Sequence, residues 1–139
     1  MCLALQEETG ADVNLLLCGL WLGSESRLLT DAQANSLNTI VAPWHTQVVR
    51  PLRAVRRRLK GWDICPIEPR EGLRAQIQQQ EIEAERLEQD MLFVASAKMT
   101  FKDADPRIAM AENLAHMAAE APRGPGDAAM CASLVDLCV

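Results

Sequence analysis

A cluster of basic side chains is the feature of this sequence best suited to binding chemistry. Six of the fourteen Lys and Arg residues lie between positions 50 and 60. Guanidinium groups bind phosphate oxygens in pairs, so a helix face lined with them predicts binding of nucleic acid or of an anionic ligand. The candidate binding residues are Arg50, Arg53, Arg56, Arg57 and Lys60.

The same stretch also has the pattern of an ordinary amphipathic helix. Apolar residues recur at spacings of four, three and four, and we expect them to face the core: Val48, Leu52, Val55 and Leu59. Arg50, Arg53, Arg57 and Lys60 then lie on the solvent side. We favour ion pairs between these basic residues and an acidic helix alongside. No aromatic residues interleave the cluster, and no helix-turn-helix signal flanks it.

The acidic helix is a weak candidate for a metal site. Glu81, Glu85 and Glu88 share one helical face. Paired carboxylates can hold a di-metal site in a helical bundle, but that site usually needs Glu-x-x-His on partner helices. The nearest pairing is Glu112 with His116, which are four residues apart. A solvated face with Glu–Arg pairs explains the pattern as well.

Other catalytic and cofactor-binding signatures are missing from the sequence. His45 and His116 are the only histidines, and no Cys/His combination has a standard zinc spacing. Neither a nucleophile elbow nor a glycine-rich phosphate loop is present. We therefore predict no catalytic residues, no metal ligands and no cofactor, and an enzyme is the least supported function.

Charge and cysteine content point to a cytoplasmic protein without a membrane partner. The net charge of −5 opposes indiscriminate binding to phosphate backbones or anionic lipid. The five cysteines are odd in number and no pair has CxxC spacing, which favours reduced thiols in the cytoplasm. The longest apolar stretch, residues 13–22, is shorter than the ~20 residues that span a bilayer.

Helical periodicity runs through the whole chain, so the predicted fold class is all-α, a bundle of five to seven helices. Asp12, Thr30 and Asp105 are expected N-caps, and Thr30 forms a capping box with Gln33. Gly23 suits a left-handed C-terminal position. The predicted helices cover residues 2–8, 13–22, 30–42, 44–60, 71–94, 105–120 and 128–137.

Two proline positions and the longest helices define the expected arrangement. Pro43 either begins a helix or kinks a continuous one, and Pro51 should bend the helix that contains it. A short connector makes residues 44–60 and 71–94 a long antiparallel hairpin. We expect a heptad seam with one polar member, Gln80, on the second helix of this hairpin: Leu73, Ile77, Gln80, Ala84, Leu87, Met91 and Val94.

The domain organisation follows from the same pattern. Residues 1–121 are predicted to form a single helical domain built around the apolar helix 13–22. Residues 122–139 contain a Pro/Gly break followed by a short C-terminal helix or a flexible tail. Trp21, Trp44 and Trp62 have apolar neighbours, so we expect them to be buried.

Several motifs in a fixed order carry a family resemblance. They are Cys2–Gln6, Asp12–Leu17, Trp21–Gly23, Ala42–Trp44, Val48–Arg53, Arg56–Lys60 and Glu83–Gln89. With these motifs, the sequence from residue 2 to about 120 resembles a bacterial family known only as a conserved domain of unknown function. This resemblance implies an additional apolar helix upstream, so we expect the chain to be an N-terminally shortened form.

Taken together, these patterns favour a small cytoplasmic helical adaptor or assembly protein that acts through protein–protein contacts. Its expected partner is another protein or a second copy of the chain. The alternative is a binder of nucleic acid or an anionic ligand that uses the basic residues between positions 50 and 60.

Overall fold

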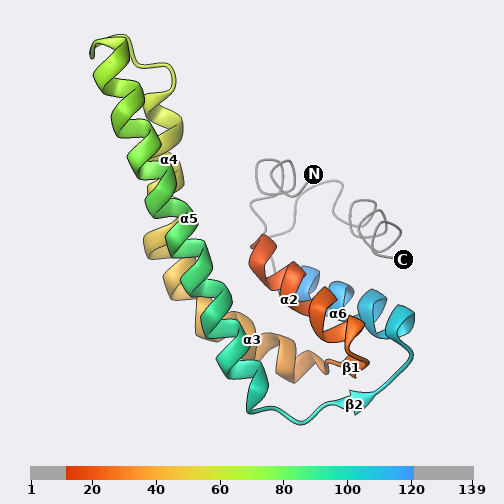
Figure 1. Cartoon of the computed structure of the whole chain (residues 1–139). Coiled ribbons are helices and arrows are strands. Elements are labelled where there is room, and N and C mark those ends of the chain that lie inside the picture. The colour runs from red at the N-terminus through yellow and green to blue at the C-terminus, as the bar shows by residue number, and fades with distance from the viewer. Residues whose placement is uncertain (1–11, 121–139) are drawn as a thin grey trace.

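The computed structural model describes residues 12–120, which form a bundle of helices (Figure 1). Two short strands pair antiparallel, with Arg27 opposite Asp103. The predicted all-α class is confirmed, with this two-stranded addition. In chain order the elements are α2 (Val13–Ser24), β1 (Arg27–Leu28), α3 (Asp31–Trp44), the π-helix η1 (His45–Val49), α4 (Arg50–Leu59), α5 (Ile67–Ala97), β2 (Lys102–Asp103) and α6 (Pro106–Glu120).

The number of helices differs from the expectation of five to seven. Because α3, η1 and α4 follow one another without a break, the described residues contain four continuous helical segments. The expected helices 2–8 and 128–137, and the tail 122–139, lie outside the described residues. None of the helices described between residues 12 and 120 combines the length and the apolar character that spanning a bilayer requires.

Local capping signals fix where the helices begin, as predicted. Asp12 accepts a hydrogen bond from the backbone N–H of Asn14 at 3.0 Å. Thr30 and Gln33 form the complete capping box. The Asp105 carboxylate accepts from the backbone N–H of Arg107, directly after Pro106 at the first helical position. These side chains satisfy backbone donors that the first turn of a helix leaves free.

The core surrounds α2, the helix predicted to be most buried. Nine of its twelve residues are buried. α6 packs along α2, while α3 and α5 close the other sides of the core. The largest fully buried apolar side chains include Leu15, Leu22, Leu37, Leu92, Leu114 and Met117.

Gly23 has a different role from the predicted one. It lies inside α2, and it is Ser26 that adopts a left-handed conformation, with φ of 64°. A Cβ atom on Gly23 would lie 2.5 Å from the backbone nitrogen of Met110. Gly23 therefore allows the α2 and α6 backbones to approach closely, and the expected left-handed C-terminal glycine was wrong.

One continuous helical segment runs from α3 through η1 to α4, so Pro43 does not begin a new helix. Pro43 lies inside α3, and the π-helix η1 follows one residue later. In η1 the backbone N–H of Arg50 donates to His45, five residues earlier. Pro51 has no N–H and its ring clashes one turn back, so the wider π turn directly before it accommodates the proline.

The predicted hairpin is present, with α4 packed antiparallel along α5 (Figure 1). α5 begins four residues earlier and ends three residues later than the sequence indicated. The closed end of the hairpin extends beyond α2 and α6.

The predicted heptad seam of α5 is mostly not buried within the described residues. Of its seven members only Ala84 is buried, while Leu73 and Val94 are about half exposed, at 49% and 54%. The buried side of α5 is instead mostly polar: Arg70, Glu81, Ala84, Glu88, Leu92 and Ser96. Charged residues occupy this side because their partners lie on the neighbouring helices, as described below.

The tryptophans were expected to be buried, and two are not. Trp21 is 38% exposed and Trp62 is 46% exposed. Trp44 is half-buried, and its indole Nε1–H donates to the backbone oxygen of Ala84 at 2.9 Å. Trp44 therefore joins the end of α3 to the middle of α5.

Candidate functional site

The basic stretch of α4 divides into residues that face α5 and residues that face solvent. Arg53, expected on the solvent side, is only 6% exposed, whereas Val55, expected in the core, is 47% exposed. Arg50, Arg57 and Lys60 are exposed as predicted. The helix is rotated relative to the prediction because ion pairs to α5 bring Arg53 inward.

Arg53 and Arg56 converge on two carboxylates of α5. Arg53 Nε lies 3.2 Å from Glu81 Oε1, and Arg53 Nη2 lies 2.9 Å from Glu85 Oε1. Arg56 pairs with the other oxygen of Glu81. Arg50, Arg53 and Arg57 were expected to pair with the acidic helix, and this pairing is confirmed for Arg53. Arg56 was not among the residues expected to pair, and it also contacts this helix. Binding of an external ligand by the basic residues stays a prediction.

A second polar cluster lies next to these pairs and was not predicted. His45 Nδ1 lies 3.3 Å from Glu88 Oε2 and 3.5 Å from Asp12 Oδ2. All three residues are buried, and Glu88 is completely inaccessible to solvent. Donor atoms of the three residues lie within 4.8 Å of one another. Carboxylate oxygens and an imidazole nitrogen in this arrangement can hold a divalent metal ion.

Local structure aims each of these three side chains at the others. Asp12 caps α2 through Oδ1, which leaves Oδ2 directed toward His45. His45 is the first residue of η1, one residue after Trp44 is joined to α5. Glu88 follows Ala84 by one helical turn. The cap, the π turn and the middle of α5 therefore meet at one point.

Asn14 and Gln89 surround this cluster with amide groups. Asn14 Nδ2 donates to Glu88 Oε2 at 3.1 Å, and Gln89 Nε2 donates to Asn14 Oδ1 at 2.9 Å. Within the described part of the chain, His45 Nε2 and Glu88 Oε1 are buried and have no hydrogen-bond partner. Such atoms are uncommon in folded proteins and often mark a site that binds water or an ion.

Burial also shifts the titration of the cluster. Desolvation first, and then the hydrogen bond and charge of Glu88, raise the pKa of Asp12 to about 8. Burial lowers the pKa of His45, and the positive charges of Arg53 and Arg50 lower it further, against the opposing effect of Asp12. Near neutral pH the cluster therefore favours a protonated Asp12 and a neutral imidazole.

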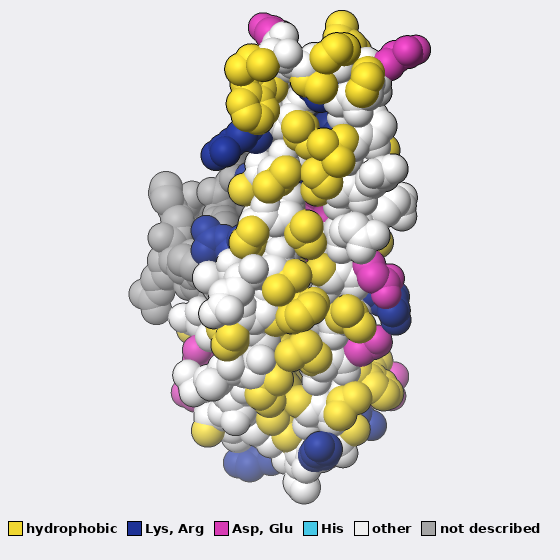
Figure 2. Space-filling view, turned by 90° about the vertical axis from the view of Figure 1, so that its left-hand side faces the viewer, with side chains coloured by type: hydrophobic (Ala, Val, Ile, Leu, Met, Phe, Trp, Pro, Cys, Tyr) yellow, Lys and Arg dark blue, Asp and Glu magenta, His cyan; other side chains and the backbone are white. Residues whose placement is uncertain are grey.

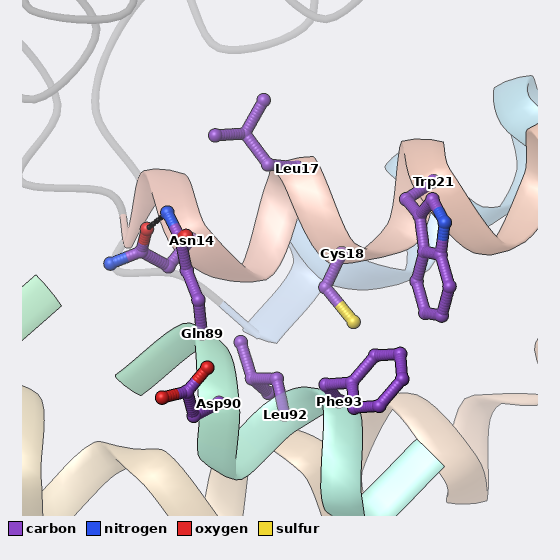
Figure 3. A pocket seen from close by; sticks show the side chains of 8 residues that line it. All are labelled: Asn14, Leu17, Cys18, Trp21, Gln89, Asp90, Leu92 and Phe93. Carbon is purple, nitrogen blue, oxygen red and sulfur yellow. Dashed lines mark hydrogen bonds between the residues drawn. The ribbon is translucent and has the colours of Figure 1, made fainter. Parts of the chain in front are cut away.

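A groove of about 360 Å³ between α2 and α5 reaches the edge of this cluster (Figure 3). Asn14 and Gln89 form one end, joined by the hydrogen bond drawn there. Cys18 and Trp21 point from α2 toward α5, and Trp21 meets Phe93 with ring centroids 5.6 Å apart. Burial raises the pKa of the Cys18 thiol to about 11, which fits the expected unreactive, reduced cysteine.

The other pairings weighed from the sequence do not form part of the cluster. His116 Nδ1 contacts Asp31 on α3. Glu112 is exposed. Sequence spacing could not reveal the cluster, because Asp12, His45 and Glu88 come from three separate elements, and the two acids had other local interpretations as a cap and as a solvated face.

Replacing Arg53 tests the importance of the ion pairs between α4 and α5. Arg53→Ala should lower the free energy of unfolding by about 3 kcal/mol, because it leaves buried carboxylate charge on Glu81 and Glu85 less compensated. Arg86→Ala is the matched control, since Arg86 pairs with Glu83 and Asp90 on the exposed side of α5. Urea unfolding should show no measurable loss for the control. Equal losses for both variants would contradict the structural role of Arg53.

Asp12 should make the folded chain less stable as pH rises. Its pKa is 3.8 when unperturbed and about 8 in the fold, so between these values the folded state binds one more proton than the unfolded state. With a metal chelator in the buffer, the wild type should have a higher free energy of unfolding than Asp12→Asn at pH 5. This difference, the advantage of the wild type, should shrink between pH 5 and pH 8. Asn still caps the helix. His45 acts in the opposite direction, but only below about pH 6.5. An advantage that stays constant between pH 5 and pH 8 would show that Asp12 is ionised in the fold.

Comparison with known proteins places the chain in a family without assigning an activity. Residues 1–92 match the family described as protein of unknown function (DUF2390). The matched segment includes the basic stretch of α4 and all three residues of the buried cluster. No curated protein and no solved structure matches the chain. Since the match covers well over half of the sequence, the chain belongs to the DUF2390 family of proteins of unknown function.

Proposed function

We propose that this protein acts as a helical assembly module, and that the partner of its hairpin is a second copy of the same chain. The supporting observation is an apolar surface along one side of the α4–α5 hairpin, which we call the hairpin face (Figure 2). Its residues are at least partly exposed: Val48, Leu52, Val55, Leu59, Leu73, Ile77, Leu87, Met91 and Val94.

Helix geometry puts the apolar residues of both helices on the same side of the hairpin. Arg53 and Glu81 face each other between α4 and α5. Each residue turns a helix by about 100°. On this basis the apolar stripe of each helix lies roughly 100° around the helix axis from Arg53 on α4 or from Glu81 on α5. Because the helices are antiparallel, both rotations lead to the same side. Figure 2 shows hydrophobic side chains gathered along the length of the two helices.

The spacing of α5 favours a second copy over an unrelated protein. A twofold axis near Ala84 would bring Leu73 opposite Val94, and Ile77 opposite Met91. An interface of this kind requires one surface that is complementary to itself. The helix is 31 residues long, which corresponds to about 46 Å. Two such hairpins can cover their apolar sides as a four-helix bundle, whereas one hairpin leaves that side exposed to water.

Two further properties remain part of the proposal. We place the protein in the cytoplasm, with support from the free thiols of Cys18 and Cys65, because reducing compartments keep cysteines unpaired. Binding of nucleic acid or an anionic ligand through the exposed residues Arg50, Arg57 and Lys60 is the second candidate. The net charge of −5 and the engagement of Arg53 and Arg56 by α5 make it less favoured.

Sedimentation equilibrium and light scattering test the proposed assembly. The wild type at about 100 µM should have twice the 15.3 kDa mass of one chain, because apolar burial drives association. Leu87→Glu places a charge on the hairpin face and should weaken the dimer by at least about tenfold. Ile82→Glu is the matched control, because Ile82 is exposed on α5 but points roughly 140° away from Leu87.

The control separates the proposed surface from general effects of added charge. The dimer should persist in Ile82→Glu, and circular dichroism should show that both variants keep their helices. A monomeric wild type, or a dimer that both substitutions weaken equally, would overturn the proposal.

A further inference from the structure

We propose that Asp12, His45 and Glu88 bind one four-coordinate divalent metal ion of the Zn²⁺ type. The ion would be held by Asp12 Oδ2, His45 Nδ1 and Glu88 Oε2, with a fourth position left for water or another ligand. The proposal rests on the geometry, the burial and the chemistry of these three side chains.

The distances from the His45 nitrogen to the two carboxylate oxygens agree with tetrahedral coordination. Zn²⁺ binds nitrogen and oxygen ligands at about 2.0–2.1 Å, and a tetrahedral angle then separates neighbouring donors by about 3.3–3.4 Å. The observed separations from His45 Nδ1 are 3.3 Å to Glu88 and 3.5 Å to Asp12. Neighbouring donors in an octahedral site would be closer, at about 2.9 Å for the same bond length.

Burial provides a second, independent reason for a bound cation. Two carboxyl groups share the imidazole of His45 in a region from which water is largely excluded. Glu88 is completely buried, and its Oε1 has no hydrogen-bond partner within residues 12–120. Removing a carboxylate from water is costly unless the charge is compensated. A divalent cation would supply that compensation.

The residues around the cluster hold two of the ligands in place. The backbone N–H of Asn14 donates to Asp12 Oδ1, and its side chain donates to Glu88. Gln89 in turn donates to the Asn14 side chain. Neighbouring hydrogen bonds of this kind orient the ligands in metal sites. Asn14 and Gln89 also line the groove in Figure 3, so one end of the groove lies next to the cluster.

The choice of metal class follows from the donor atoms. Imidazole nitrogen suits Zn²⁺, Fe²⁺, Ni²⁺ and Cu²⁺ better than Mg²⁺ or Ca²⁺, which prefer six or more oxygen ligands. Three protein ligands with one open position are typical of zinc sites that bind a further molecule, while structural zinc sites have four protein ligands.

Titration of the untagged full chain with Zn²⁺ and Co²⁺ tests the site. After treatment with chelator, calorimetry should show one bound Zn²⁺ per chain, and Co²⁺ should give the visible absorption of a four-coordinate ion. Glu88→Gln and His45→Gln should each lower the affinity by at least about 100-fold, since each removes a direct ligand. Added Zn²⁺ should raise the melting temperature of the wild type but not that of these variants.

His116→Gln is the matched control, because His116 forms the other His–carboxylate contact in the described residues, with Asp31. This variant should bind Zn²⁺ as the wild type does. If His45→Gln or Glu88→Gln fails to fold, Asp12→Asn serves in its place, because Asn preserves the helix cap.

Two results would overturn the proposal. One is the absence of stoichiometric binding to the folded wild type. The other is binding that the ligand substitutions leave unchanged, which would place the metal elsewhere, for example on cysteines. In either case the cluster would be a hydrogen-bonded network that joins the helices.

Discussion

The complete burial of Glu88 is the constraint on which the arrangement of the helices depends. A carboxyl group without access to water must be satisfied by its neighbours, or it destabilises the fold. Glu88 Oε2 meets this demand through Asn14 of α2 and His45 of η1, whereas Oε1 has no hydrogen-bond partner among residues 12–120. Each partner lies at the start of its own element. The position of α2 and the turn from α3 into α4 are therefore both tied to one residue of α5.

The same principle continues along the hairpin. One to two turns before Glu88, Glu81 and Glu85 pair with Arg53, and Arg56 joins Glu81. These charges occupy the side of α5 that faces α4 and the rest of the molecule. The apolar seam of α5 is then displaced toward solvent, where it joins the stripe of α4. The polar contacts inside the hairpin and the apolar surface on its side thus both result from the charged residues of α5 that face α4.

Sequence reasoning succeeded where the signal is local. The capping box of Thr30 and Gln33, the caps at Asp12 and Asp105, and the two helices of the hairpin all depend on residues within a few positions of one another. Helix formation and capping obey rules of this range. The all-α class and the central helix α2 follow from the same local patterns.

The errors concern which side of a helix faces inward. Arg53 and Glu81 were expected at the surface because charged residues are rarely buried unless they are paired. Their pairing was predicted, but its burial was not, because it depends on how two helices, whose paired residues are 28 positions apart, are rotated toward each other, which periodicity does not report. The exposed Val55 follows from the same rotation. The cluster of Asp12, His45 and Glu88 depends in the same way on three elements meeting.

The buried cluster of Asp12, His45 and Glu88 joins the helices and, as proposed above, also holds a metal ion. The most direct test is diffraction from crystals grown with Zn²⁺, with data collected above and below the zinc absorption edge. We predict an anomalous peak about 2 Å from His45 Nδ1 and from one oxygen each of Asp12 and Glu88. Well-ordered side chains at the cluster with no anomalous peak between them would contradict the account.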